Sequence, residues 1–141
     1  DGWLITSSER GIQILLNHYC HYDSLYCLRY QKLEDPQQAY SVFKKDGLVK
    51  FEISLSNLPA GRYEVKQYLI SPQYGSSFDV WLNMGMPQYV RNEEIEYLKR
   101  AAQPQYHVET LELQNGYSTE IRLAPHEVRI ILLNKETEFE I

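Results

Sequence analysis

Five residues in one short stretch carry side chains that bind transition metals in proteins: His18, Cys20, His21, Asp23 and Cys27. The stretch continues a run of alternating apolar residues, which is typical of a β-strand. Successive strand side chains point to opposite faces, so His18 and Cys20 share one face and His21 lies on the other. Zinc sites usually have tighter spacings, such as Cys-x₂₋₄-Cys or His-x₃₋₅-His. We therefore expect packing and hydrogen-bonding roles here, with no metal site and no cofactor.

The two cysteines, Cys20 and Cys27, are expected to be free thiols. They are separated by seven positions, and a disulfide needs Cα atoms within about 7 Å. An extended stretch of that length cannot meet this distance unless the chain turns back. Reduced thiols are usual inside cells, and no Asn-x-Ser/Thr sequon occurs. A cytoplasmic location is therefore expected.

Composition excludes several classes of function. The net charge is −5 with no basic cluster, which argues against nucleic-acid contacts by this chain. No apolar run is long enough to span a membrane, and no signal peptide is visible. No Ser-His-Asp arrangement, phosphate loop or dinucleotide fingerprint occurs. The chain, whose first residues Asp1-Gly2-Trp3 read as the middle of a longer protein, fits one domain over 1–141.

Alternating hydrophobicity dominates the chain and predicts strands. Turn clusters, such as Asn57-Leu58-Pro59-Ala60-Gly61 and the hairpin signal Asn115-Gly116, separate them. After the first of these turns, Tyr63 and Val65 fall on one face of the expected strand, whereas Tyr68 and Ile70 fall on the opposite face. A β-bulge near Lys66-Gln67 would explain that change. Strands are expected at 11–19, 49–56, 106–113, 118–123 and 128–133, and around Tyr63 to Ile70.

One helix is expected at about 92–102. Asn92 is a suitable N-cap, Glu93 and Glu94 suit the positive N-terminus of the helix dipole, and Lys99 and Arg100 suit its other end. Many short strands with one short helical insert predict an all-β fold, an antiparallel β-sandwich.

The segment Phe78-Asp79-Val80-Trp81-Leu82-Asn83-Met84-Gly85-Met86-Pro87 is far longer than an ordinary strand connection of about 2–6 residues. Together with the helix that follows it, and with Pro125-His126-Glu127-Val128-Arg129, it resembles the C-terminal β-sandwich of glycoside hydrolase family 39. That family holds bacterial β-xylosidases and α-L-iduronidases. The resemblance is strongest at 11–22, 79–98 and 123–133, and it covers nearly the whole chain.

The resemblance also identifies Asn92-Glu93 as a misleading motif. In the family, the acid/base catalyst is the Glu of an Asn-Glu pair on a barrel strand, and a second Glu is the nucleophile. Retaining hydrolysis needs two carboxyl groups about 5–5.5 Å apart, and the (β/α)₈ barrel that holds them needs about 200 residues or more. Here the pair starts a helix in a chain of 141 residues, so we expect no catalytic residue and no enzyme activity of this chain alone.

The resemblance implies a non-catalytic accessory domain that braces an upstream (β/α)₈ barrel and contributes to oligomer assembly. A second parent would be an AraC-type transcription regulator carrying a family-39-like region, in which the module would serve sensing or dimerisation. The rival from another class is an autonomous carbohydrate-binding module, since Trp3, Trp81 and the 12 tyrosines could stack on sugars.

The candidate interface residues are Trp81, Leu15, Tyr19, Ile131 and Leu133. Trp81 is expected to be buried between the helical insert and the sandwich. The other four are expected on an outer sheet face, because the strands at 11–19 and 128–133 carry apolar residues at both parities. A free-standing sandwich usually has polar residues on its outer face, so apolar residues there indicate a surface that another domain or a second copy covers.

Overall fold

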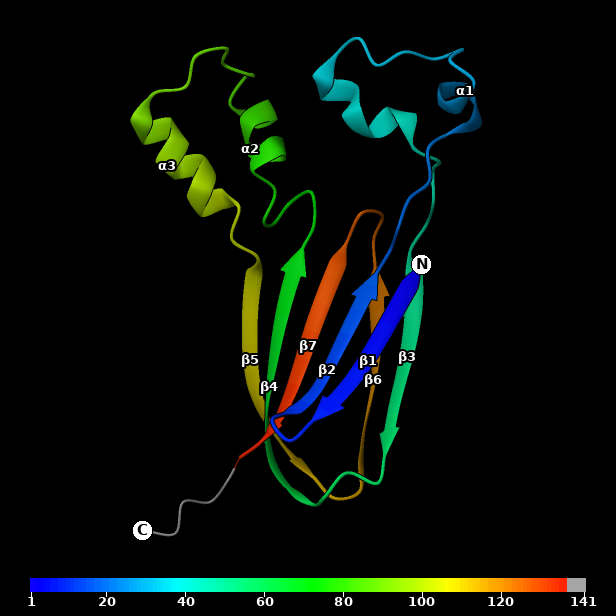
Figure 1. Ribbon diagram of the computed structural model, residues 1–141, viewed down its shortest axis with the longest axis vertical. Helices are drawn as coiled ribbons and strands as arrows, with labels where there is room; N and C mark the ends of the chain where they lie inside the picture. The colour runs from blue at the N-terminus through cyan, green and yellow to red at the C-terminus, as the bar shows by residue number, and fades with distance from the viewer. Residues whose placement is uncertain (137–141) are drawn as a thin grey trace.

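The computed structural model describes residues 1–136 and shows two antiparallel sheets packed face to face, with all helices at one end (Figure 1). The larger sheet has five strands in the order β1-β2-β7-β4-β5, and the smaller pairs β3 with β6. The predicted all-β antiparallel sandwich is confirmed. The strands are β1 (Gly2–Ser8), β2 (Gly11–Asn17), β3 (Val49–Ser56), β4 (Gly61–Ile70), β5 (Gln105–Leu113), β6 (Gly116–Leu123) and β7 (Val128–Lys135).

The core lies between the two sheets and is built by alternate residues of their facing sides. From the five-stranded sheet come Ile14, Leu16, Val65, Ile131 and Leu133, all with almost no exposed surface. The two-stranded sheet covers them with the buried side chains Ile53, Tyr117, Ile121 and Leu123.

The pairing of β4 corrects one prediction. Its register with β7 runs without interruption from Tyr63↔Lys135 to Ile70↔Val128, and its register with β5 is equally continuous. The predicted bulge at Lys66-Gln67 is therefore wrong. The parity changes because Val65 faces the core while Tyr68 and Ile70 face outward, on a side of the sheet that is also apolar.

Two helical arms project beyond the same end of the sheets (Figure 1). The first arm, residues 18–48, contains α1 (Ser24–Cys27) and the 3₁₀ helix η1 (Pro36–Val42). The second arm, residues 71–104, contains α2 (Ser77–Asn83) and α3 (Asn92–Ala101), which pack on each other. None of the described helices is long and apolar enough to cross a membrane.

The helix predicted at 92–102 is confirmed as α3, with Glu93 and Glu94 in its first turn. Its N-cap, however, is Arg91 and not Asn92. The Arg91 backbone N–H donates to Glu94 Oε2 at 2.6 Å, which is half of a capping box. Helix α2 was not predicted, because its 7 residues are too few for a helical periodicity to be visible.

Candidate functional site: an apolar docking surface

A row of apolar side chains crosses all five strands on the outer face of the larger sheet. Its members are directly paired: Leu4 with Leu15, Leu15 with Ile130, Ile130 with Tyr68 and Tyr68 with Tyr106. These residues alternate with the core residues of the same strands, so they point away from the two-stranded sheet. Leu4 is 56% exposed and Ile130 is 37% exposed. We call Leu4, Leu15, Ile130, Tyr68 and Tyr106 the outer-face row.

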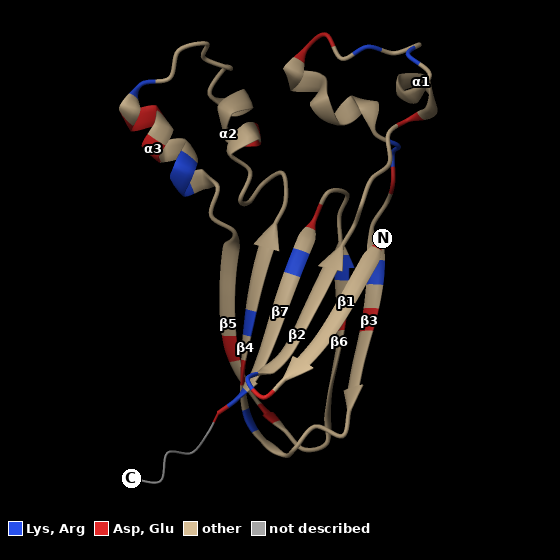
Figure 2. Ribbon diagram, in the orientation of Figure 1, with Lys and Arg blue, Asp and Glu red and all other residues tan. Residues whose placement is uncertain are grey.

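The apolar surface extends beyond this row. Ile70, on the same face of β4, and Val108, on the same face of β5, are also exposed. Strands β1 and β2 carry no charged residue, and none of the helices within 1–136 crosses the front of the sheet (Figure 2). An exposed apolar area of this kind on a protein surface marks an interaction site.

A groove of about 550 Å³ continues this surface toward the first arm. Leu15 belongs to both the groove and the outer-face row, and Tyr19 lines the groove beside it. His126 stands at its edge, with its ring 4.6 Å from that of Phe43 and 4.9 Å from that of Tyr40. Burial lowers the pKa of His126, and the nearby His18 lowers it further. The groove thus has aromatic walls and an imidazole whose pKa lies below its ordinary value.

Two of the four predicted sheet residues lie on this surface, and two do not. Leu15 is partly exposed and Tyr19 is exposed, and the structure brings them together. Ile131 and Leu133 are 0% exposed and belong to the core, so their predicted position on the outer face is wrong. The outward positions of β7 are Val128, Ile130 and Leu132, which are paired with outward positions of β2 or β4.

The sequence of β7 could not show which of its residues face the core, because both of its faces are apolar. That assignment requires the pairing of β7 with its neighbouring strand. Ile131 is the partner of Ile14, and Ile14 lies on the buried face of β2. Once β7 is placed beside β2, directly paired residues must share a face, and Ile131 follows Ile14 into the core.

Trp81 lies in the second arm, on α2, and is partly buried. Its Nε1–H donates to the carbonyl oxygen of Pro87 at 3.1 Å, and its ring lies 6.1 Å from that of Phe78. Both partners belong to the same arm. The indole therefore closes the loop that follows α2.

A tyrosine–aspartate contact ties the two arms together. Tyr40 Oη donates to Asp79 Oδ2 at 2.7 Å, joining η1 to α2. Ser76 Oγ donates to the same oxygen. Burial, and then the hydrogen bond to Asp79, raise the pKa of Tyr40 above its ordinary value. Sequence reasoning missed this pair, because 39 positions separate the partners.

The fold places the five potential metal ligands of residues 18–27 in different surroundings. Asp23 caps α1, where its Oδ1 accepts from the Leu25 N–H at 2.8 Å. The His21 ring packs edge-on against Tyr19. Cys27 is exposed and Cys20 is buried, and the two thiols are not bonded to each other. Only His18 and Cys20 stay together, both buried.

Comparisons with known proteins show the same fold in three glycoside hydrolases. No family model matches the chain, and no curated protein matches it. A monomeric β-xylosidase from Caulobacter crescentus superposes with a TM-score of 0.72 at 15% identity, over 94% of this chain and 26% of that one. A GH39 enzyme from Xanthomonas axonopodis pv. citri has a TM-score of 0.67 at 12% identity, over 95% and 26%. A bacterial orthologue of human α-L-iduronidase has a TM-score of 0.68 at 15% identity, over 97% and 22%.

The chain spans about a quarter of the length of these enzymes. Nearly all of it superposes, so it has the fold of one domain of GH39 enzymes. The resemblance drawn from 79–98 and 123–133 is confirmed at the level of the fold. Residues 1–136 contain no (β/α)₈ barrel, and Asn92-Glu93 forms the first turn of α3, behind the N-cap Arg91.

Proposed function

We propose that this chain is a non-catalytic accessory domain of a family-39-like, β-xylosidase-like glycoside hydrolase, in which it braces the catalytic barrel and helps to assemble the oligomer. The observation that carries the proposal is the outer-face row, because it gives a domain of this fold an apolar surface that none of the described residues 1–136 covers. The three similar enzymes are each about four times the length of the chain, which leaves ample room for a barrel. One of them is a monomeric β-xylosidase, so the barrel contact is the primary role.

The composition of the surface favours protein docking over sugar binding. Sugar-binding platforms present aromatic rings on which pyranose faces stack, with polar groups around them to bind hydroxyls. Here Tyr68 and Tyr106 pack on each other with ring centroids 5.0 Å apart, and the rest of the row is aliphatic. Leu4, Leu15 and Ile130 offer no hydrogen bonds to hydroxyl groups, but they suit the apolar core of a domain interface.

The test is association in trans. The barrel-coding part of the parent polypeptide is expressed separately with an affinity tag, and binding of the 141-residue chain is measured. We expect binding by the wild-type chain and at least ~10-fold weaker binding by Ile130→Glu, because a charge would be buried at the interface. Ser54→Glu is the matched control, since Ser54 is exposed on β3 in the other sheet.

Three results would contradict the proposal. One is a parent polypeptide that encodes no barrel, and another is an Ile130→Glu chain that binds as well as the wild type. The third is hydrolysis of aryl β-xylosides by the purified chain, which we expect to be absent. Xylo-oligosaccharide binding that Tyr106→Ala abolishes would instead establish a carbohydrate-binding module.

A further inference from the structure

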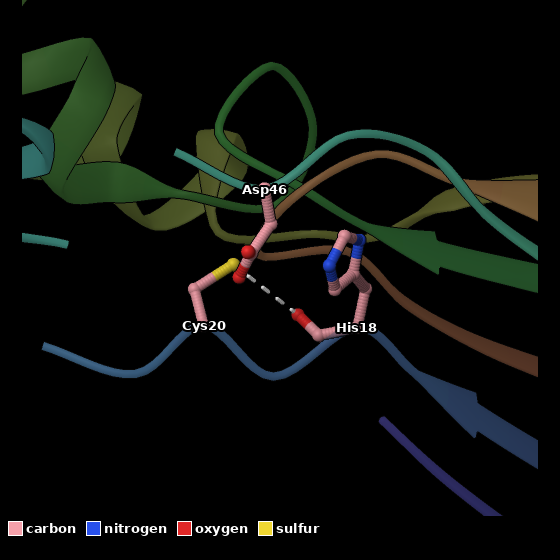
Figure 3. A group of neighbouring side chains, drawn as sticks. All are labelled: His18, Cys20 and Asp46. Carbon is pink, nitrogen blue, oxygen red and sulfur yellow. Dashed lines mark hydrogen bonds between the residues drawn. The ribbon is translucent and has the colours of Figure 1, made fainter. Parts of the chain in front are cut away.

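We propose that His18, Cys20 and Asp46 bind a divalent transition-metal ion, and that Zn²⁺ is the ion whose chemistry fits them best. A ring nitrogen of His18, the Sγ of Cys20 and a carboxylate oxygen of Asp46 all lie within 4.8 Å of one another. Figure 3 shows the three side chains converging from two segments. Neither the fold nor the proposed docking function requires such a site.

Backbone pairing within the first arm brings Asp46 to the other two ligands. Residues 18–23 and 42–46 run side by side: the Asp23 N–H donates to the Val42 carbonyl at 2.8 Å, and the Lys44 N–H donates to the His21 carbonyl at 2.9 Å. The bridge between Tyr22 and Phe43 lies between these bonds. Asp46 is 26 positions beyond Cys20, so spacing rules for zinc motifs could not detect the cluster.

His18 is held in the tautomer that a metal needs. Its Nδ1 lies 3.2 Å from the carbonyl oxygen of Leu123, and because a carbonyl only accepts, the proton must be on Nδ1. In the neutral ring, Nε2 then carries the free lone pair. Metal-binding histidines are commonly oriented by such a bond from the other ring nitrogen. The side chain is rigid as well, since His18 is only 3% exposed.

The remaining surroundings also suit a cation. Cys20 is 3% exposed, and its thiol makes only a weak bond of 3.8 Å to the His18 carbonyl oxygen. The Asp1 carboxylate lies 3.7 Å from His18 Nε2 and adds negative charge. Together, Asp1, Asp46 and a Cys20 thiolate would compensate a divalent ion.

Coordination requires the three ligand atoms to move closer together. Tetrahedral zinc with bonds of about 2.0–2.3 Å holds its ligand atoms roughly 3.5 Å apart, against the present limit of 4.8 Å. Mixed nitrogen, sulfur and oxygen donors favour zinc or cobalt over magnesium or calcium. His18 and Cys20 also line the groove described above, which gives an ion a route from solvent and leaves a fourth position for Asp1 or water.

Co²⁺ is the probe, because a cobalt–thiolate bond gives a charge-transfer band in the near ultraviolet. The 141-residue chain is stripped with a chelator and titrated with Co²⁺ alone. We expect the band to saturate at one ion per chain and to vanish when Zn²⁺ displaces Co²⁺. Zn²⁺ should also raise the Tm, since an ion that binds only the folded state stabilises it.

Three variants assign the ligands. Asp46→Asn is the principal variant, because Asp46 is exposed and its replacement should not unfold the chain. For this variant we expect at least ~10-fold weaker Co²⁺ binding and no Zn²⁺-dependent rise in Tm. Cys20→Ala should abolish the charge-transfer band. Cys27→Ser is the control, because Cys27 is exposed and not part of the cluster, and it should bind as the wild type does.

The proposal is overturned if folded wild-type protein shows no charge-transfer band. It is equally overturned if the band is lost in Cys27→Ser, or if Asp46→Asn binds Co²⁺ with unchanged affinity. Because circular dichroism reports folding of each variant, a Cys20→Ala chain that fails to fold leaves the decision to Asp46→Asn. None of these outcomes depends on the barrel contact.

Discussion

Ile130 and Ile131 are neighbours in β7 that the structure places on opposite faces, and truncating each to Ala tests which face is the core. Ile131 is 0% exposed. Ile131→Ala removes three carbon groups, about 2.4 kcal/mol of transfer free energy at ~0.8 kcal/mol each. A cavity term is added because the surrounding core cannot fully collapse. We expect a total loss of about 3–4 kcal/mol in the free energy of unfolding.

Ile130→Ala should cost much less. Ile130 is already 37% exposed, and it packs only against its neighbours on the outer face of the sheet. Truncation leaves an open dent and no closed cavity, so only part of the transfer term is lost, about 1 kcal/mol. The expected difference between the two variants is therefore about 2–3 kcal/mol, although they remove the same atoms from adjacent positions of one strand.

Equilibrium unfolding in urea measures the free energy of unfolding of both variants. An unchanged slope of that free energy against urea concentration shows that each variant exposes the same surface on unfolding as the wild type. The chain must be kept dilute, because association through the outer face would stabilise the folded state in a concentration-dependent way. Equal losses, or a larger loss for Ile130→Ala, would refute the assignment of faces. In that case the outer face would be covered as completely as the core.

Three further predictions concern the arms and the thiols. The raised pKa of Tyr40 means that the folded chain keeps a proton that the unfolded chain releases near pH 10. The folded state is therefore stabilised by the neutral Tyr40 below that pH, and this contribution to the free energy of unfolding is lost as the pH rises above it. Tyr40→Phe should therefore reduce the alkaline fall in Tm, and an unchanged fall would show that burial and the Asp79 contact do not raise the pKa of Tyr40. Trp81→Phe loses the bond to Pro87 and should cost about 1 kcal/mol in urea unfolding, whereas a loss of 3 kcal/mol or more would mean that the indole packs against the sandwich. Thiol titration of denatured, unreduced protein should give two reactive groups per chain. In the native protein, Cys27 should react rapidly and Cys20 slowly, and equal rates would contradict the burial of Cys20.

Some of the fold could be predicted from the sequence because it rests on local physics. Alternation locates a strand wherever one face is polar, as in β3, where Val49 and Ile53 alternate with lysine, glutamate and serine. The helix α3 was predictable because charge and capping act within one or two turns. The short helix α2 and the strand β1, with no polar alternation and no charge, gave no such signal.

The amino-acid pattern is enough to predict an antiparallel sandwich with a helical insert, and to show more apolar strand faces than one core needs. Which of those faces is buried follows from strand pairing. The pairing of Ile14 with Ile131 turns one side of β7 inward, whereas alternation in a strand with two apolar faces is the same for either choice. The folded chain also sets which side chains meet. Chain reversals bring Tyr40 to Asp79, and they bring His18 and Cys20 to Asp46. Contacts made in this way leave no periodicity in a sequence, so sequence patterns do not predict them.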